Sequence, residues 1–239
     1  MRLGKPWQAA LLAAMILATP RVAQAVDVYV VEAKGIELAP GQVLDGAKPL
    51  SLAVGQKLVL VTADGRTIKL KGPSEAAPAA EVQMAQADMA KSLKGLMTAQ
   101  AADTTSAGVV RSGGDERPPP PEPWLVDVRH GGDHCVMAGG EVVLWRGLGA
   151  LGETEIEISP SDRSWRAKAP WPAGEDRLAL PASLPLHNGK AYLLALGTSS
   201  VAVTIHAVPA SLGTDAARAA WLLELGCGAQ ARALVNGAQ

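Results

Sequence analysis

The sequence contains no phenylalanine, and its aromatic residues are limited to six tryptophans and two tyrosines among 239 residues. Val, Leu and Ala must therefore fill most of any hydrophobic core, with tryptophan supplying the largest side chains. Five of the six tryptophans lie at or after Trp124. The apolar share of 48% is enough for one large core or two small ones.

The sequence also lacks an excess of either charge, since 22 Lys and Arg face 23 Asp and Glu. A nucleic-acid partner is not indicated, because proteins that bind nucleic acids carry a strongly basic surface. No apolar run after residue 25 approaches the length of about 20 residues that a membrane-spanning helix needs. We therefore expect no membrane span in the chain that follows residue 25.

The first 25 residues have the three parts of a secretory signal peptide. Arg2 and Lys5 give a positively charged start, residues 9–18 form a short apolar run, and Ala23-Gln24-Ala25 is a small-x-small cleavage site. The pattern predicts export by a Sec-type signal, cleavage after Ala25, and a periplasmic or secreted location. A retained N-terminal anchor or a buried helix is the alternative.

Residues 26–73 consist of short alternating apolar runs, and turn signals recur every eight to ten residues. The clearest hairpin signal is Asp64-Gly65, because Asp-Gly suits the positive φ values of a tight turn. These features predict a small all-β unit. About fifty residues make a thin core, so we expect this unit to be only marginally stable alone.

This β unit resembles the β-repeat region of FecR-like periplasmic domains, which stack short strands around glycine turns. The resemblance covers about fifty residues, and four segments carry it: Gly41-Gln42-Val43-Leu44, Leu50-Ser51-Leu52, Gly55-Gln56-Lys57-Leu58 and Asp64-Gly65-Arg66-Thr67-Ile68-Lys69-Leu70. It implies a periplasmic relay or envelope-associated module without catalytic residues. The full regulators also have a membrane span and a cytoplasmic part, so signalling to a sigma factor is not expected of this chain.

A helix and a linker are predicted between this unit and the rest of the chain. Residues 75–100 are rich in Ala, Gln, Met, Lys and Leu, with an approximate helical stripe of apolar side chains. Residues 101–123 are small and polar and then contain four consecutive prolines, a composition typical of a flexible spacer. We place the domain boundary in this linker.

The C-terminal domain, residues 124–239, begins with three strand-like runs. Residues 125–128 and 135–137 flank Gly131-Gly132 and predict a hairpin, and residues 142–145 follow as a third strand. Further strands are predicted at residues 153–158, 191–196 and 201–208. With no helices between these strands, the fold class is mainly β, an antiparallel β-sandwich or open barrel.

A helical hairpin is predicted at the C-terminus. Thr214 is a suitable N-cap, Gly226 a suitable stop, and residues 227–235 can form a second short helix. We expect this hairpin to lie against the β-domain through three apolar side chains, Trp221, Leu222 and Leu234.

Motifs for enzymatic chemistry are weak or missing. The sequence has no G-x-S-x-G or S-x-x-K motif. Glu153, Glu155 and Glu157 share one face of a single strand, whereas the acids of glycosidases generally come from separate elements. Residues 147–152 match G-x-G-x-x-G, but a dinucleotide site needs a helix immediately afterwards and the next residues alternate as in a strand. We expect a loop there and no cofactor, and the sequence disfavours an enzyme without excluding one.

His130 and His134 are the candidate metal ligands, with Asp133 between them. Their side-chain types suit zinc, and the two rings could converge across a hairpin tip. A working site needs a third ligand, which Cys135 could supply unless it is otherwise engaged. This loop is the basis of the alternative function, a periplasmic hydrolase or metal-binding protein.

Cys135 and Cys227 are the only cysteines, and both lie in the part of the chain that is expected to be exported. Because disulfides form and persist in oxidising compartments, we predict that these two residues are bonded. The bond would hold the helical hairpin on the sheet. Two separate buried thiols are the alternative.

Together these features favour a non-enzymatic exported protein that binds a partner or accompanies other components of the cell envelope. Its partner would be an envelope protein or a glycan. The identity of that partner and the oligomeric state are not determined by the sequence.

The signal-peptide assignment predicts the N-terminus of the mature protein. Mass spectrometry of the exported protein should find Val26 as its first residue, because the Ala23-Gln24-Ala25 site is positioned for signal peptidase. A mature protein that still begins with Met1 would contradict the assignment.

Overall fold

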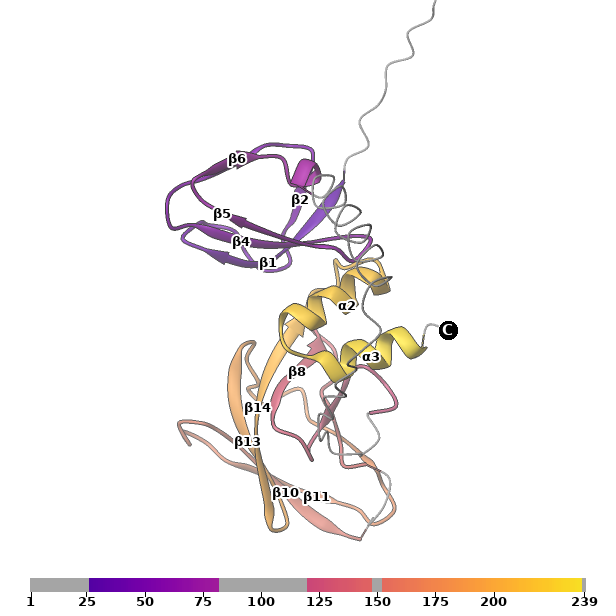
Figure 1. The fold of residues 1–239 in the computed structure, drawn as a ribbon. Coiled ribbons are helices and arrows are strands. Elements are labelled where there is room, and N and C mark those ends of the chain that lie inside the picture. Colours follow the sequence, from indigo (N-terminus) through magenta and orange to yellow (C-terminus); the bar gives the residue numbers. More distant parts are fainter. Residues whose placement is uncertain (1–25, 82–119, 148–151, 238–239) are drawn as a thin grey trace, which may run out of the picture.

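The computed structural model describes residues 26–81, 120–147 and 152–237, and Figure 1 shows their arrangement. The described chain is mainly β, with 42% strand and 14% helix, and a pair of helices packs together at its C-terminus. The predicted fold class is therefore confirmed. The predicted signal peptide, residues 101–119 of the predicted linker and most of the helix at 75–100 lie outside the described residues; of the predicted helix, residues 78–81 are helical.

The N-terminal unit contains two sheets around a small core. One sheet has four antiparallel strands in the order β2-β1-β4-β5, namely Val43–Asp45, Asp27–Lys34, Lys57–Thr62 and Thr67–Lys71. The other pairs β3 (Leu50–Leu52) with β6 (Ser74–Ala76), so the unit extends three residues beyond Pro73. Alternate residues of the strands bury Val, Leu and Ile between the sheets: Val28, Val30, Leu52, Leu58, Leu60, Ile68 and Leu70.

The predicted Asp64-Gly65 hairpin joins β4 to β5. The Thr62 N–H donates to the Arg66 carbonyl at 2.9 Å, and Gly65 adopts φ +83°, a value that only glycine takes without strain. The Thr62 hydroxyl also donates to the Asp64 carboxylate across the turn. Local turn chemistry therefore sets the register of these two strands, as the sequence predicted.

The C-terminal unit is built from two sheets that enclose a second core. A five-stranded sheet has the order β11-β10-β13-β14-β8, and a three-stranded sheet has the order β12-β9-β7. In chain order these strands are β7 Leu125–Asp127, β8 Gly132–Met137, β9 Val143–Trp145, β10 Thr154–Pro160, β11 Ala167–Trp171, β12 Arg177–Ala179, β13 Lys190–Leu196 and β14 Ser199–Val208. The predicted strands at 153–158, 191–196 and 201–208 correspond to β10, β13 and β14.

The hairpin predicted between residues 125–128 and 135–137 is wrong. Strand β7 pairs with β9 and strand β8 pairs with β14, both in parallel, so the two segments belong to different sheets. Val126 and Val136 both enter the core between these sheets. Because β7 and β8 lie on opposite sides of the core, both strands bury apolar side chains that a two-stranded hairpin would leave half exposed. The predicted hairpin tip is instead a crossover between sheets.

Two short helices close the chain. Helix α2 (Asp215–Glu224) begins at Thr214, whose hydroxyl accepts the Ala217 N–H at 3.2 Å, and it ends before Gly226 at φ +83°. Helix α3 (Gly228–Gly237) follows at once, which confirms the predicted helical hairpin. Neither helix is long and apolar enough to cross a membrane, and the same holds for every helix within the described residues.

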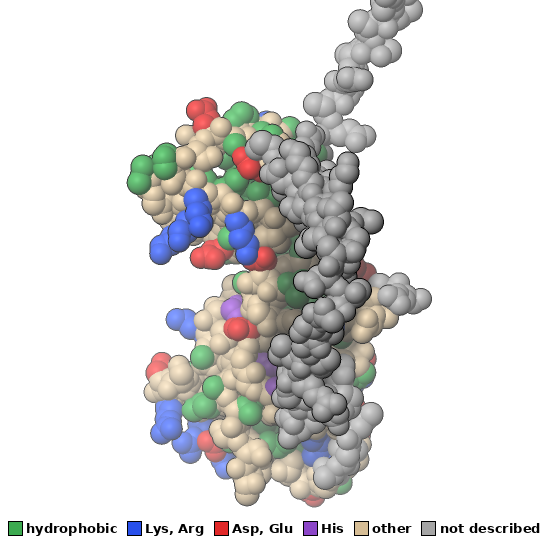
Figure 2. All heavy atoms as spheres, in the orientation of Figure 1, with side chains coloured by type: hydrophobic (Ala, Val, Ile, Leu, Met, Phe, Trp, Pro, Cys, Tyr) green, Lys and Arg blue, Asp and Glu red, His purple; other side chains and the backbone are tan. Residues whose placement is uncertain are grey.

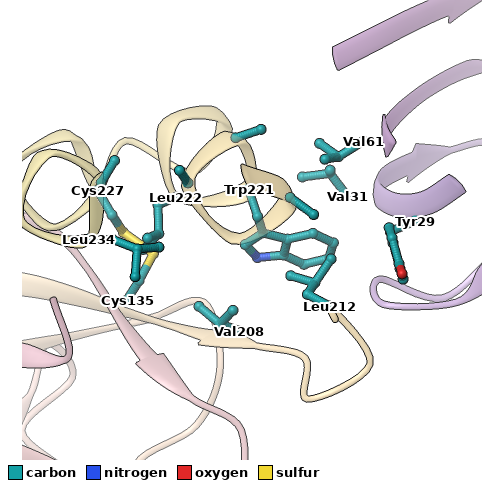
Figure 3. Packing of buried hydrophobic residues seen from close by; sticks show 14 residues of the cluster. Tyr29, Val31, Val61, Cys135, Val208, Leu212, Trp221, Leu222, Cys227 and Leu234 are labelled. Atoms are coloured by element: carbon teal, nitrogen blue, oxygen red, sulfur yellow. A yellow bond between two sulfur atoms is a disulfide. The ribbon is translucent and has the colours of Figure 1, made fainter. Parts of the chain in front are cut away.

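The helix pair fills a third core that both β units share (Figure 3). Tyr29, Val31 and Val61 of the N-terminal sheet lie on one side of Trp221, which is 1% exposed. Apolar residues of the C-terminal unit and of the two helices complete the cluster: Cys135, Val208, Leu212, Ala217, Ala219, Ala220, Leu222, Cys227, Ala231 and Leu234. The predicted contacts of Trp221, Leu222 and Leu234 are confirmed, and the same helices also contact the N-terminal unit.

Polar contacts border the apolar contact between the two units. The Thr214 hydroxyl donates to the Ala63 carbonyl, and the Ser211 hydroxyl donates to the Gly41 carbonyl at 3.2 Å. The Lys69 ammonium pairs with the Glu224 carboxylate at 2.8 Å. Helix α2 therefore holds the N-terminal sheet by both burial and hydrogen bonding.

Two glycines provide a matched test of this contact. Gly65 and Gly55 have nearly the same φ, +83° and +84°, but a Cβ at Gly65 would lie 2.7 Å from the Ala216 carbonyl oxygen of α2, whereas a Cβ at Gly55 meets nothing within 4 Å. Both changes to alanine should cost about 1–2 kcal/mol from the left-handed backbone. Gly65→Ala should cost a further 1–3 kcal/mol, roughly the penalty of overpacking.

The measurement is the free energy of unfolding in denaturant for the wild type and each variant. Gly55→Ala serves as the control for backbone strain alone. Equal destabilisation by the two substitutions would contradict a close contact between the β4–β5 turn and α2.

Candidate functional site

The Cys135–Cys227 disulfide joins β8, the edge strand of the five-stranded sheet, to the residue before α3. The two Cα atoms are 6.0 Å apart and the residues are separated by 92 positions, so the predicted bond is confirmed. Closing a loop of this length stabilises the fold by about 4–5 kcal/mol in the chain-entropy model. Both sulfurs are used, and the described chain has no free cysteine. The bond indicates an oxidising, extracytoplasmic location.

Gln230 lies beside the disulfide and joins three segments of the chain. Its side chain is almost completely buried, and its Oε1 accepts the Cys135 N–H at 2.7 Å. Its Nε2 donates to the carbonyls of Cys135 and Pro123, both at 2.7 Å, and to that of Leu125 at 3.3 Å. The amide thus provides hydrogen bonds to the Cys135 N–H and carbonyl on the side of β8 that faces away from β14. A further strand could otherwise pair with these backbone groups.

The residues of the predicted metal site line a cavity of about 310 Å³ next to this disulfide. Asp127 ends β7, and its carboxylate accepts from the Arg129 guanidinium at 2.7 Å and from His130 Nδ1 at 2.9 Å. Burial raises the pKa of Asp127, but the hydrogen bonds from Arg129 and His130 outweigh it and hold the pKa below its ordinary value. The His130 ring is therefore tied to a carboxylate by its Nδ1.

His134, on β8, is 7% exposed and points its Nε2 at the His130 carbonyl oxygen, 3.2 Å away. Nε2 must donate there, which leaves Nδ1 as an acceptor, and that atom is buried without a hydrogen-bond partner among the described residues. Burial lowers the pKa of His134 more than the hydrogen bond to His130 and the charges of Asp127 and Asp133 raise it. This histidine is therefore neutral at pH 7.

The structure does not assemble a complete metal site from these residues. Cys135 is in the disulfide, and His206 Nε2 contacts Asp133 Oδ1 at 2.8 Å. Within the described ranges, no group of three or more His, Cys, Asp or Glu side chains is arranged to hold a metal ion. The described lining of this cavity also contains no Ser, Thr or free Cys that could serve as a nucleophile.

The other sequence motifs occupy loop and surface positions. The G-x-G-x-x-G segment is described only at Gly147 and Gly152, and strand β10 follows it where a dinucleotide site would need a helix. On β10, Glu155 pairs with Lys168 and Glu157 pairs with Arg166, all partly or fully exposed. These carboxylates lie on the outer face of the sheet.

The larger cavity, of about 430 Å³, was not predicted from the sequence. It opens where β8 ends, between the Gly139-Gly140 turn, the end of β14 and residues 180–188. Most of its lining side chains are apolar: Val136, Met137, Ala138, Val142, Leu180, Pro181, Ala182, Leu184, Leu186, Ile205 and Ala207. Glu141 and Asn188 are its polar side chains, and the Asn188 Oδ1 accepts the Ala207 N–H at 2.8 Å.

The volume of this cavity lies in the usual range for ligand-binding sites, about 300–1,000 Å³. Its side chains are mostly apolar, and backbone polar groups also line it. One sequence signal could have indicated it: residues 180–186, Leu-Pro-Ala-Ser-Leu-Pro-Leu, are apolar yet lack the alternation of a strand. Such a segment covers a core without joining a sheet, and here it leaves a hollow beside β14.

His134 makes the stability of the protein depend on pH. Its folded pKa lies below the ordinary value of 6.5, so the unfolded chain takes up a proton that the folded chain does not. The contribution of His134 is complete above pH 6.5 and declines as the pH falls from 6.5 toward the folded pKa. His134→Gln, which retains a side-chain donor, should remove this part of the decline.

The measurement is the free energy of unfolding between pH 7.5 and pH 5 for the wild type, His134→Gln and His187→Gln. His187 is exposed and serves as the matched control. If His134→Gln leaves the pH dependence as steep as in the wild type, His134 is not held neutral by burial.

The chain matches no protein-family model, no curated protein and no solved structure. The resemblance of residues 26–73 to FecR-like domains therefore remains a prediction. Among the described residues, the larger cavity is the feature that best fits a binding role.

Proposed function

We propose that the protein is a non-enzymatic binding protein of the cell envelope, and that the 430 Å³ cavity beside β8 and β14 receives an apolar part of its partner. The cavity is the observation that carries this proposal. Its walls bury apolar surface, and burial of such surface is the main source of affinity in sites of this kind. Glu141 and Asn188, at the same site, orient the bound group.

The exported location is the second element of the proposal. The disulfide and the signal-like residues 1–25 both support it. In this proposal, residues 26–239 lie in the periplasm or outside the cell after cleavage at Ala25. The FecR-like pattern of residues 26–73 supports an envelope-associated role. A protein in this position meets other envelope proteins, lipid chains and glycans.

Binding is favoured over catalysis by the chemistry of the cavity. The side chains that line it within the described ranges include no histidine, cysteine or lysine, and Glu141 is the only acid. Hydrolysis needs a nucleophile or an activated water together with a proton carrier, usually from more than one residue. The lining supplies apolar contact, one carboxylate and one amide.

Site-specific photocrosslinking tests this function. A photoreactive amino acid placed at Ala182, on the exposed part of the cavity lining, should give discrete adducts with an envelope component in cells that export the protein. The same amino acid at Val54, which is 82% exposed on the N-terminal unit, is the matched control and should give none of these adducts.

A second variant links the adducts to the cavity itself. Ala138 is exposed and lines the cavity, so Ala138→Trp should fill the opening without disturbing the core and should abolish adduct formation from position 182. Adducts that form equally from positions 182 and 54, or that persist with Ala138→Trp, would overturn the proposed site. Turnover of an envelope component by the purified protein would overturn the non-enzymatic assignment.

A further inference from the structure

A row of lysines crosses the N-terminal sheet at one end of its three longest strands. The register places Lys34 of β1 directly opposite Lys57 of β4, and Lys57 directly opposite Lys71 of β5. Directly opposed residues on neighbouring strands project from the same face, about 4.8 Å apart. The three ammonium groups therefore project from one line across the sheet, and all three side chains are exposed.

The face that carries this row is the one that contacts the helix pair. On β4, Leu58 and Leu60 point into the core of the N-terminal unit, whereas Lys57, Val59 and Val61 point to the opposite face. Val61 and Tyr29 cover Trp221 at one end of that face. The lysine row lies at the other end, beyond the part that α2 covers.

Lys69 lies at the boundary between the part of this face that α2 covers and the part that is exposed. It lies two residues from Lys71 on the same side of β5, and its ammonium pairs with Glu224 of α2 at 2.8 Å. This ion pair marks the limit of the helix contact. Figure 2 shows Lys and Arg side chains on the N-terminal unit, with Asp and Glu side chains between them and the notch that separates this unit from the C-terminal unit.

Within the described residues, no ion pair joins Lys34, Lys57 or Lys71 to an acidic side chain. Like charges directly opposite each other on neighbouring strands destabilise a sheet. The row is not a result of overall composition, because the whole sequence has a formal net charge of −1. Electrostatic repulsion among the three lysines thus destabilises this end of the sheet, and a bound anionic ligand would remove the repulsion.

We propose that this lysine row binds a linear acidic glycan of the cell envelope. The three lysines form a line across the sheet, one on each strand, so they match a chain of spaced anions better than a single anion. Their spacing, one strand apart, is comparable to the length of one sugar in an extended glycan. Lysine provides a flexible point charge, which suits repeated carboxylates that need no bidentate geometry.

The row runs along a single line across the sheet, and the helix pair covers the other end of the same face. This arrangement favours a linear chain over a flat membrane. The inference uses the exported location but not the cavity of the C-terminal unit. Failure of the cavity experiments therefore leaves it intact, and the reverse also holds.

The test is a titration of the purified full chain with polygalacturonate at low salt, with neutral dextran as the control polymer. The row variant carries Lys34→Gln, Lys57→Gln and Lys71→Gln. A charge-matched control carries Lys48→Gln, Arg163→Gln and Lys190→Gln at exposed positions elsewhere. We expect the row variant to lose at least tenfold in affinity and the control variant to lose less than twofold.

Two further measurements test whether binding depends on the lysine charges and whether the row variant remains folded. The wild type should bind polygalacturonate less tightly as salt rises, with a shallower dependence in the row variant, because fewer charge contacts are then lost. The row variant should unfold at the same denaturant concentration as the wild type or a higher one, since it lacks the repulsion. This shows that lost binding does not come from lost folding.

Several outcomes would overturn the proposal. Equal loss of affinity in the row and control variants would mean that overall charge alone drives binding. Binding of polyphosphate, or of phosphatidylglycerol vesicles, without binding of polygalacturonate would assign the row to phosphate groups or to a membrane. No binding of polygalacturonate by the wild type would exclude an acidic glycan as the ligand.

Discussion

The covalent and hydrogen-bonded link between β8 and α3 is the constraint on which the rest of the structure depends. The Cys135–Cys227 bond fixes the start of α3 on the edge strand of the five-stranded sheet, and Gln230 satisfies the exposed backbone of the same strand. These contacts add to the apolar packing of the helix pair, which needs tertiary support because each helix has only ten residues and helices this short are marginal alone. The helix pair in turn supplies the surface that covers Tyr29 and Val61. The position of the N-terminal unit therefore depends on a bond in the C-terminal one.

This dependence explains how a small β unit can be ordered. Its own core contains seven buried Val, Leu and Ile side chains, which is little for about fifty residues. The outer face of its four-stranded sheet adds a second apolar surface, which α2 covers with Trp221 and other apolar side chains. The remaining part of that face carries the lysines and, beside Lys34 on β1, the exposed Glu32. One face of one sheet is thus divided between a structural contact and a charged surface, and the Lys69–Glu224 ion pair lies at the division.

Features set by neighbouring residues could be predicted from the sequence, and features set by distant pairing could not. The Asp64-Gly65 turn, the Thr214 cap and the stop at Gly226 depend on side chains or φ values within a few residues, and all three are confirmed. The disulfide could be predicted because only two cysteines were available. The parallel pairing of β7 with β9 and of β8 with β14 depends on segments far apart in the chain, and the Gly131-Gly132 pair suggested a hairpin instead. The cavity and the role of Gln230 follow from that pairing, so sequence patterns did not indicate them.

The metal-site hypothesis illustrates the same limit at the level of a site. His130, Asp133 and His134 are neighbours in sequence, yet each side chain has a different partner: Asp127, His206 and the His130 carbonyl. Their proximity is used to hold the crossover between two sheets next to the disulfide. The two surfaces proposed for binding lie instead on different units, which the helix pair keeps in a fixed relation. For a partner that reached both proposed surfaces, the second contact would be intramolecular, so that two weak contacts would together give appreciable affinity.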